Sequence, residues 1–235
     1  MIGALFIALA IGLFVVLNYS RQSSPAPITP STSSESTTAP KTQSTSPAGS
    51  ALTALGQLEV KGRAPKTGYA RTQFGDGWLL TGSCDTRNII LNRDLSNVTL
   101  SDSCKVASGI LADPYTGTTI SFVRGKDTSS VVQIDHVVAL SNAWQTGAQL
   151  LSPDVRISFA NDPLELLAVD GNANQAKGDG DAATWLPSNK AFRCQYVARQ
   201  IAVKAKYHLW VTDAEKAAMQ RVLSACTDQA LPSAS

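Results

Sequence analysis

Residues 131–140 read VVQIDHVVAL, and this stretch decides how the rest of the chain is interpreted. Val131, Val132 and Ile134 are apolar and β-branched, a composition that predicts a buried strand. Asp135 and His136 interrupt the apolar run side by side, and the run resumes directly after them. An adjacent acid and imidazole are costly on an apolar element unless they have partners or a metal. The pair therefore indicates either a functional centre or a core histidine bonded to a structural aspartate.

A second stretch, residues 166–181, reads LLAVDGNANQAKGDGD. Its first four residues are apolar and predict a short strand, and a polar loop containing Asn174 and Lys177 follows. The two stretches together give the order strand, Asp-His, loop, strand, Asn-x-x-Lys and helix. Asp179 and Asp181 are expected to cap the next helix, because aspartate accepts hydrogen bonds from the free N–H groups of a helix start. The alternative is a contact with metal-bound water.

With these two stretches in place, the sequence resembles the HNH, or His-Me finger, endonuclease family. It is similar in particular to a secreted actinobacterial branch, which resembles the C-terminal nuclease domain of modification-dependent restriction enzymes. Five ordered blocks carry the resemblance between about residues 69 and 226: CDTRNIILNRDL, DPYTG, QIDHVVALSNAWQTGA, FANDPLELLAVDGNANQAKGD and WLPSNKAFRCQYV. The resemblance implies an α+β fold, in which a ββα-metal core carries added N-terminal strands and C-terminal helices.

The same resemblance assigns catalytic and metal-binding roles. It makes His136 the general base that activates water, with Asp135 and Asn174 as the catalytic metal ligands. A neutral imidazole suits this task because its reference pKa of about 6.5 lies near neutral pH. Carboxylate and amide oxygens are hard donors that suit Mg²⁺ or Mn²⁺ better than a tight zinc site. The expected cofactor is therefore Mg²⁺ or Mn²⁺.

Three basic residues are expected to bind the substrate. Arg87 would clamp a phosphate bidentately, or would equally hold a nearby aspartate in a structural pair. Lys177 would touch a phosphate or be an ordinary surface lysine. Arg193 belongs to a predicted helix, residues 188–207, which carries basic residues and no acid. Such a helix is usually a solvated face, but beside a nuclease centre it is a candidate phosphate rail. The basic residues of this stretch are Lys190, Arg193, Arg199, Lys204 and Lys206.

One position departs from the resembled family. The residue nine before Asn174 is an Asn in that family, where it braces the loop between the two strands, and here it is Glu165. An ionised Glu only accepts hydrogen bonds, whereas Asn both donates and accepts. We expect Glu165 to accept from backbone N–H groups of a shifted loop; the alternative is a carboxylate that leans toward the metal. Asn161, four residues earlier, is out of the matching register.

Four cysteines lie at positions 84, 104, 194 and 226. Their even number suits two disulfides in an oxidising compartment, and a zinc site is disfavoured because no Cys-x-x-Cys is present. Of the three possible pairings we expect Cys84–Cys104, which brackets a candidate strand, loop and strand. Cys194–Cys226 would then tie two C-terminal helices together. Paired cysteines place the domain outside the cytoplasm.

The N-terminal region predicts export. Residues 2–17 are unbroken apolar or Gly, so residues 1–21 are expected to be a membrane anchor or a signal segment. The uncleaved anchor is favoured, because no Lys or Arg precedes the run. Residues 22–52 are rich in Ser, Thr and Pro and predict a disordered linker. The nuclease domain is expected at 53–228, with a flexible tail at 229–235 and a last helix that starts with a capping box at Thr212.

The sequence thus predicts an exported, metal-dependent endonuclease that is membrane-anchored or secreted. DNA is the favoured substrate and RNA the alternative. Little sequence specificity is expected, because no separate reader module is found. The formal net charge of +2 gives no global field for nucleic acid, so any basic surface must be local. No obligate protein partner is evident, and the membrane contact would run through the N-terminal segment. The alternative is a catalytically weakened surface binding module that keeps the fold.

Overall fold

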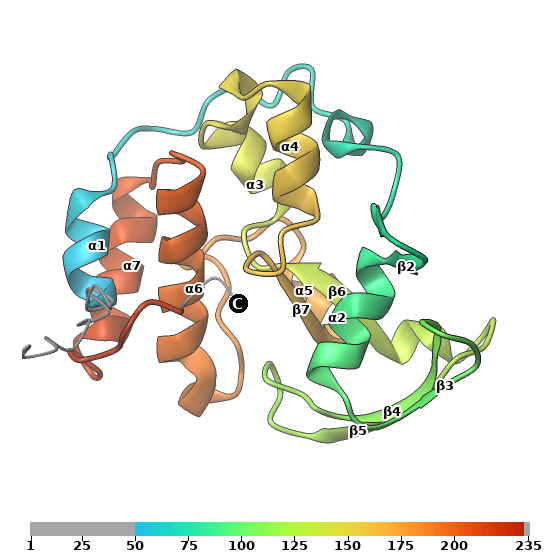
Figure 1. The fold of residues 1–235 in the computed structure, drawn as a ribbon. Helices are drawn as coiled ribbons and strands as arrows, with labels where there is room; N and C mark the ends of the chain where they lie inside the picture. The colour runs from blue at the N-terminus through green and yellow to red at the C-terminus, as the bar shows by residue number, and fades with distance from the viewer. Residues whose placement is uncertain (1–49, 233–235) are drawn as a thin grey trace, which may run out of the picture. The chain divides into compact units, whose positions relative to one another are not determined.

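The computed structural model describes residues 50–232 of the 235-residue chain. The predicted anchor or signal segment, and nearly all of the predicted linker, lie outside these residues. Helices and strands both occur in the described part, which confirms the α+β class (Figure 1). None of the helices between residues 50 and 232 is long and apolar enough to cross a membrane. The expected domain bounds of 53 and 228 lie inside the described range.

Two antiparallel strands and a short helix form the part of the fold that carries the Asp-His pair. Strand β6 (Val132–His136) pairs with β7 (Leu166–Asp170), and His136 lies opposite Leu166. Helix α5 (Gly171–Lys177) follows β7 directly. Both strands were expected, and Asp135 and His136 are the last two residues of β6, at the strand end where the sequence predicted them. The Asn-x-x-Lys segment, however, lies within α5, and not before the helix.

The start of α5 is fixed by a local cap. The Asp170 carboxylate accepts a hydrogen bond from the Ala173 N–H at 2.7 Å, and this satisfies one of the free donors at the helix start. The Asp170 N–H in turn donates to the Asp113 carboxylate at 2.8 Å. The turn from β7 into α5 is therefore held from both sides, which sets where the α5 side chains meet β6.

Two hydrophobic cores lie on opposite faces of the β6–β7 pair. Val132 and Ile134 pack into the smaller core, whereas Leu167 and Val169 of β7 pack into the larger one. Side chains alternate across a strand, and residues directly opposite one another share a face. Because Asp135 lies opposite Leu167, its side chain faces the larger core, while His136 faces the other way.

The smaller core is closed by helix α2 (Thr86–Asp94) and a three-stranded antiparallel sheet. The sheet has the order β3 (Ser96–Leu100), β4 (Val106–Ala112) and β5 (Thr119–Val123). α2 contacts both β4 and β7, so it joins the sheet to the ββα unit. These are the added N-terminal strands that the resemblance implied.

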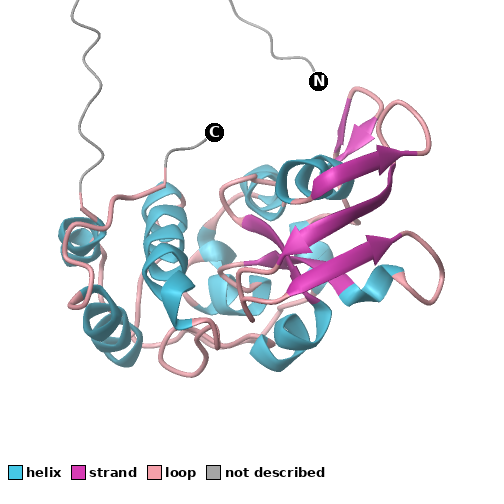
Figure 2. Cartoon of the chain, turned by 90° about the horizontal axis from the view of Figure 1, so that it is seen from below, coloured by secondary structure: helices cyan, strands magenta, loops and turns pink. Residues whose placement is uncertain are grey.

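The larger core is helical. Its helices are α1 (Ala51–Gln57), α3 (Leu140–Gln145), α4 (Pro153–Ala160), α6 (Arg193–Lys206) and α7 (Asp213–Leu223). α1 packs against α6 and α7, so the first and last described helices lie side by side (Figure 1). Figure 1 and Figure 2 show the strands gathered on one side of the described fold and helices α1, α6 and α7 on the other. The remaining elements are short: β1 (Leu80–Thr81), β2 (Cys84–Asp85), η1 (Arg71–Phe74), η2 (Ser129–Val131), η3 (Ala148–Leu150) and η4 (Lys190–Phe192).

Both predicted disulfides are present. Cys84 is bonded to Cys104, and Cys194 is bonded to Cys226. The first bond fastens the start of α2 to the turn between β3 and β4. The second joins the start of α6 to the residues after α7, as the sequence predicted. Each disulfide therefore closes one half of the fold.

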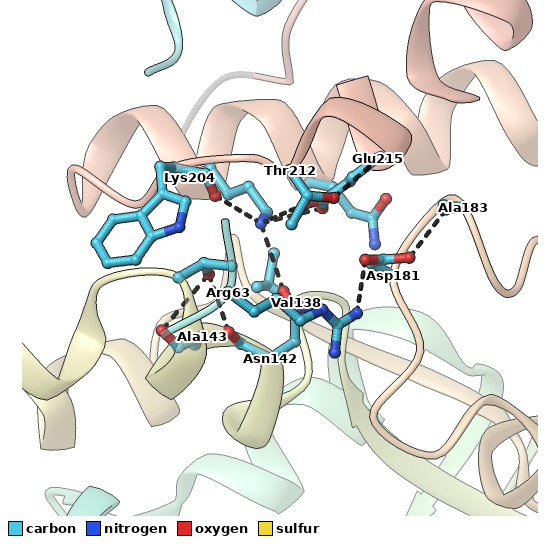
Figure 3. Close-up of polar contacts among 12 residues, drawn as sticks. Arg63, Val138, Asn142, Ala143, Asp181, Ala183, Lys204, Thr212 and Glu215 are labelled. Carbon is cyan, nitrogen blue, oxygen red and sulfur yellow. Dashed lines mark hydrogen bonds and ion pairs between the residues drawn. The ribbon is translucent and has the colours of Figure 1, made fainter. Parts of the chain in front are cut away.

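A buried polar network joins α6 and α7 to α3 (Figure 3). The Lys204 ammonium is fully buried and lies 3.0 Å from the Glu215 carboxylate and 3.4 Å from the Asn142 amide oxygen. Thr212 caps α7 by accepting from the Glu215 N–H at 3.1 Å, as predicted. The Glu215 side chain does not return to the cap as a capping box requires. It stays with Lys204, because a buried ammonium without a counter-charge is very costly.

Candidate active site

A cavity of about 610 Å³ opens beside the ββα unit. It is lined by Asp135, His136 and Asn174, so the structure brings the three predicted catalytic residues together. Arg87 also lines it. The opposite wall comes from a segment before α2 that the sequence analysis did not connect with the site. The residues of that wall are Lys66, Tyr69, Arg71 and Trp78.

His136 is held by the end of helix α4. Its Nε2 lies 3.0 Å from the Ala160 carbonyl oxygen, which belongs to the last turn of α4 and has no partner within the helix. The Trp78 indole is stacked nearly parallel on the imidazole, with ring centroids 5.8 Å apart. A carbonyl can only accept, so Nε2 carries the hydrogen and Nδ1 keeps its lone pair. The imidazole is therefore in the tautomer that offers Nδ1 as a base.

The imidazole is also kept neutral. The pKa of His136 is lowered to about 3, chiefly because the charged form loses its hydration on burial and also because the Arg71 guanidinium is near, while the bond to the Ala160 carbonyl opposes the shift. Only 6% of the residue is exposed. At neutral pH the ring is thus able to accept a proton rather than already carrying one.

The Asp135 carboxylate, which lies on the opposite face of β6 from His136, accepts hydrogen bonds from two donors. Its Oδ1 accepts from the Lys177 ammonium at 2.9 Å, and its Oδ2 accepts from the Tyr115 hydroxyl. Burial raises the pKa of Asp135, an effect that Lys177 and Tyr115 oppose. Each carboxylate oxygen has a second lone pair, so these two bonds leave acceptor capacity toward the cavity.

Lys177 does not face the solvent. Its side chain is fully buried, and besides Asp135 it donates to the His136 backbone carbonyl at 2.8 Å. The expected contact with a substrate phosphate is therefore replaced by a structural one, because the last residue of α5 points under β6. The geometry makes Lys177 a positioning residue for the Asp-His pair.

Asn174 approaches the same strand one turn earlier in α5. Its side-chain amide donates to the Gln133 amide oxygen at 2.9 Å, which fixes the orientation of the Asn174 side chain. Within the described residues, no hydrogen bond reaches the Asn174 Oδ1. Gln133 was not singled out from the sequence, although its place two residues before Asp135 puts both side chains on one face of β6.

Arg87 reaches the cavity from the first turn of α2. Its guanidinium donates to the backbone carbonyls of Ser129 at 3.4 Å and Val132 at 3.2 Å. The structural partners are thus carbonyls and not the aspartates considered from the sequence. These two long bonds use a single guanidinium nitrogen, so the other N–H groups of Arg87 stay available to a ligand.

The basic helix does not form a rail along the cavity. Arg193 donates to the Pro187 carbonyl at 2.7 Å and lines a different pocket. Lys204 is buried, Lys206 pairs with Asp162 at 2.6 Å, and Arg199 donates to backbone carbonyls. These cations hold the helical half of the fold together, because their long side chains turn back onto neighbouring loops. The structure thus places Arg193 away from the candidate site.

Glu165 follows the first of the two outcomes expected for it. The side chain is fully buried, and both carboxylate oxygens lie 3.2 Å from the Val138 N–H. Burial raises the pKa of Glu165 well above its usual range. The carboxyl group braces the backbone just after the Asp-His pair, and it is not among the residues lining the cavity.

The mouth of the cavity is formed by charged residues. Asp179 accepts from Ser141 at 3.0 Å and from Lys66 at 3.2 Å, and these bonds lower the pKa of Asp179. Asp179 therefore ties the wall to the loop after α5 instead of capping a helix. With Asp179 paired to Lys66 and Asp135 paired to Lys177, Arg71 and Arg87 have no carboxylate partner in the described part of the chain. The cavity thus has a local surplus of two positive charges.

Two comparisons place the chain among known proteins. Residues 85–222 match the family described as GmrSD restriction endonucleases, C-terminal domain. The chain is also similar to an "Uncharacterized secreted protein" from Arthroderma benhamiae (strain ATCC MYA-4681 / CBS 112371). The two are 41% identical over 181 residues, which cover 76% of this chain and 86% of the relative. The whole ββα unit falls inside the family match, and residues of its β6 and α5 line the cavity.

Proposed function

The chain belongs to the family of GmrSD restriction endonuclease C-terminal domains, and from that premise we propose that it is an exported, metal-dependent endonuclease. It hydrolyses the phosphodiester bonds of DNA with little sequence specificity, using a ββα-metal core of the HNH type. Its general base is His136. Asp135 and Asn174 hold the metal, and Arg87 contacts a phosphate.

The contact between His136 Nε2 and the Ala160 carbonyl carries this proposal. It supports a neutral imidazole whose Nδ1 takes a proton from the attacking water. The same carbonyl would stabilise the imidazolium that forms, because Nε2–H donates more strongly once the ring is charged. The stacked Trp78 keeps the ring from turning. A core histidine usually has partners for its buried nitrogens. Among the described residues, the His136 ring has a hydrogen-bond partner at Nε2 alone, and the residue lines a cavity.

The donor set fits a hard divalent cation. Asp135 offers a carboxylate and Asn174 an amide oxygen at the same cavity. No cluster of three or more His, Cys, Asp or Glu residues suited to a metal occurs between residues 50 and 232. The described residues would therefore supply only part of the coordination shell of the metal. Mg²⁺ tolerates such a site, because it keeps several of its waters. When bound, the metal would supply positive charge for the transition state and the leaving oxygen.

The substrate is assigned from the charges around the cavity. Arg71 and Arg87 present guanidinium groups, which match phosphate oxygens in geometry and charge. Two disulfides and a relative named as secreted support an extracytoplasmic location. Membrane attachment through residues 1–21 remains part of the proposal and concerns residues outside the described fold.

A second candidate function is a surface binding module without catalysis. One observation favours it: the Asp135 carboxylate is already engaged by Lys177 and Tyr115. A carboxylate neutralised in this way attracts a cation less strongly. The two functions differ in whether the protein cleaves nucleic acid in the presence of a metal. A single experiment distinguishes them.

That experiment follows nicking of supercoiled plasmid by the purified full-length protein. Chelation should stop cleavage and Mg²⁺ or Mn²⁺ should restore it. His136→Asn should lower the rate by about 10²- to 10⁴-fold, the usual contribution of a general base. His208→Asn is the matched control, because His208 is exposed, lines another pocket and has a φ of 53° that Asn tolerates. Equal loss in both variants, or full cleavage in excess chelator, contradicts the proposal.

A further inference from the structure

A second cavity, of about 310 Å³, adjoins the candidate active site. The two cavities share His136, Trp78, Arg71 and Leu140. Seven of the ten residues that line the second cavity come from the segment 71–78. That segment precedes residues 85–222, so it lies outside the family match. The second cavity is therefore built mostly by residues that the family match does not cover, next to the Asp-His pair.

The segment is fixed in place against helix α4. The Asn161 amide oxygen accepts from the Leu79 N–H at 2.9 Å, and the Asn161 amide donates to the Ile157 carbonyl at 3.0 Å. The Arg156 guanidinium donates to the Gln73 carbonyl at 2.8 Å. The end of helix α4 that orients His136 thus also anchors the wall of the second cavity. The position of that wall relative to the imidazole is therefore fixed.

The charges of the segment differ along its length. Arg71 stands at the junction of the two cavities, and Asp76 lines only the second one. Both side chains are exposed, and neither makes a hydrogen bond or an ion pair to the described residues. A phosphate is attracted to Arg71 and repelled by Asp76. Conversely, Asp76 accepts from N–H groups, such as those on the edge of a nucleobase.

The rest of the lining is apolar or small. Phe74 and Trp78 give aromatic surface, and Leu140 and Ala160 give aliphatic surface. Aromatic side chains bind bases by stacking, whatever the sequence. The volume of about 310 Å³ lies at the lower end of the range of roughly 300–1,000 Å³ for small-molecule sites. The cavity therefore suits one planar ring system, not a base pair.

We propose that the second cavity is a subsite for one unpaired nucleobase, next to the phosphodiester bond to be cut, with Arg71 holding the phosphate at the junction. This inference rests on the proposed nuclease function. It adds a substrate class, namely nucleic acid whose base is free to leave the stack. Single strands, loops and gaps meet that condition at little cost, whereas a duplex must first unpair the base.

The test uses a single-stranded DNA oligonucleotide with one cleavable linkage, the others being methylphosphonates. Full-length protein is assayed on the intact oligonucleotide and on two versions that lack the base on one or the other side of that linkage. Loss of one base should lower kcat/KM by about 5- to 150-fold, the equivalent of one base stacked on aromatic side chains. Loss of the other base should have a smaller effect. The same linkage within a duplex should be cut more slowly.

A variant checks that the cavity is responsible. Thr72→Trp places an indole at the rim of the second cavity, and it should remove the difference between the intact and abasic substrates. Thr119→Trp is the control, because Thr119 is also exposed and lies on β5 without lining either cavity. If Thr72→Trp fails to fold, the wild-type comparison still decides the matter.

The outcomes separate the two proposals. Wild-type protein that cuts intact and abasic oligonucleotides equally well overturns the subsite and leaves the nuclease function standing. Protein that cuts neither these substrates nor plasmid in Mg²⁺ or Mn²⁺ overturns the nuclease function, and the subsite with it. A parallel RNA oligonucleotide shows which sugar the site accepts.

Discussion

The buried ion pair between Lys177 and Asp135 allows a quantitative test of how the site is held. The two side chains are 0% and 6% exposed, and the charged atoms lie 2.9 Å apart. Lys177→Met keeps the length of the side chain and removes the ammonium, so Asp135 loses its counter-charge. Breaking a buried pair from one side typically costs about 3–5 kcal/mol. For a domain of this size, that corresponds to a fall in Tm of roughly 6–20 °C.

The matched control is Lys66→Met. Lys66 also pairs with an aspartate, Asp179, but both side chains of that pair are more than half exposed, at 55% and 51%. Exposed pairs contribute about 0–1 kcal/mol. The same change of side chain should therefore alter the free energy of unfolding several-fold less at position 66 than at position 177.

A double-mutant cycle completes the test. Asp135→Asn alone leaves the Lys177 ammonium buried and unpaired, so it should also be strongly destabilising. The double variant should be more stable than the sum of the two single effects predicts, because no uncompensated charge remains. Urea unfolding followed by circular dichroism gives all four free energies. The reasoning is refuted if Lys177→Met costs no more than Lys66→Met, or if the two single effects simply add.

Three further measurements test other parts of the site. Because the pKa of Glu165 is raised in the folded state, its stabilising effect is fully present below its unfolded value and is lost as the pH rises through the folded value. Glu165→Gln keeps an acceptor for Val138, so Tm relative to wild type should rise between pH 4 and pH 8; a constant difference would contradict the assignment. Asn161→Ala removes the anchor of the segment that carries the indole stacked on the imidazole, and nicking should slow by about ten- to a hundredfold with the fold intact by circular dichroism. Two unpaired arginines at the cavity predict that log(1/KM) falls with log[salt] at a slope of roughly −2, whereas a slope near −6 would require a longer phosphate contact surface.

The two strands of the ββα unit, the order of its elements and both disulfides could be predicted from the sequence. The strand, loop and strand expected between Cys84 and Cys104 were wrong in part, because helix α2 fills most of the interval before β3. The β-branched run before Asp135 and the apolar run from Leu166 each specify a strand within a few residues. Each cysteine is bonded to its neighbour in the sequence, so one disulfide lies in each half of the domain. The place of the Asp-His pair was also predicted: Asp135 and His136 are the last two residues of β6, where they pair with Leu167 and Leu166 of β7. The start of α5 was less well predicted, because Asn174 and Lys177 were expected in a polar loop and both lie in the helix.

The burial and the ion-pair partners of the charged side chains could not be predicted in the same way. Lys177 and Lys204 look like surface lysines in the sequence, since nothing local marks them as buried. Each pairs with an acid on another element: Lys177 with Asp135 of β6, and Lys204 with Glu215 of the next helix, α7. Glu165 was anticipated more closely, because its carboxyl group accepts from the backbone N–H of Val138 as expected. The sequence did not show that burial raises the pKa of Glu165 and so favours its protonated form.

The candidate site includes residues from the segment before α2, which lie outside the Asp-His and Asn-x-x-Lys motifs. Arg71 and Trp78 have no periodicity and no fixed spacing to His136, so no sequence pattern connects them. They reach the imidazole because Asn161 holds the neighbouring backbone at the end of α4. That same helix end provides the Ala160 carbonyl that sets the His136 tautomer. Residues 159–162 (FAND) thus affect the His136 imidazole in two ways: the Ala160 carbonyl accepts its hydrogen bond, and Asn161 anchors the segment that carries the stacked Trp78 indole. Substitutions in this block should therefore change the reactivity of His136 even where the substituted side chain does not contact the ring.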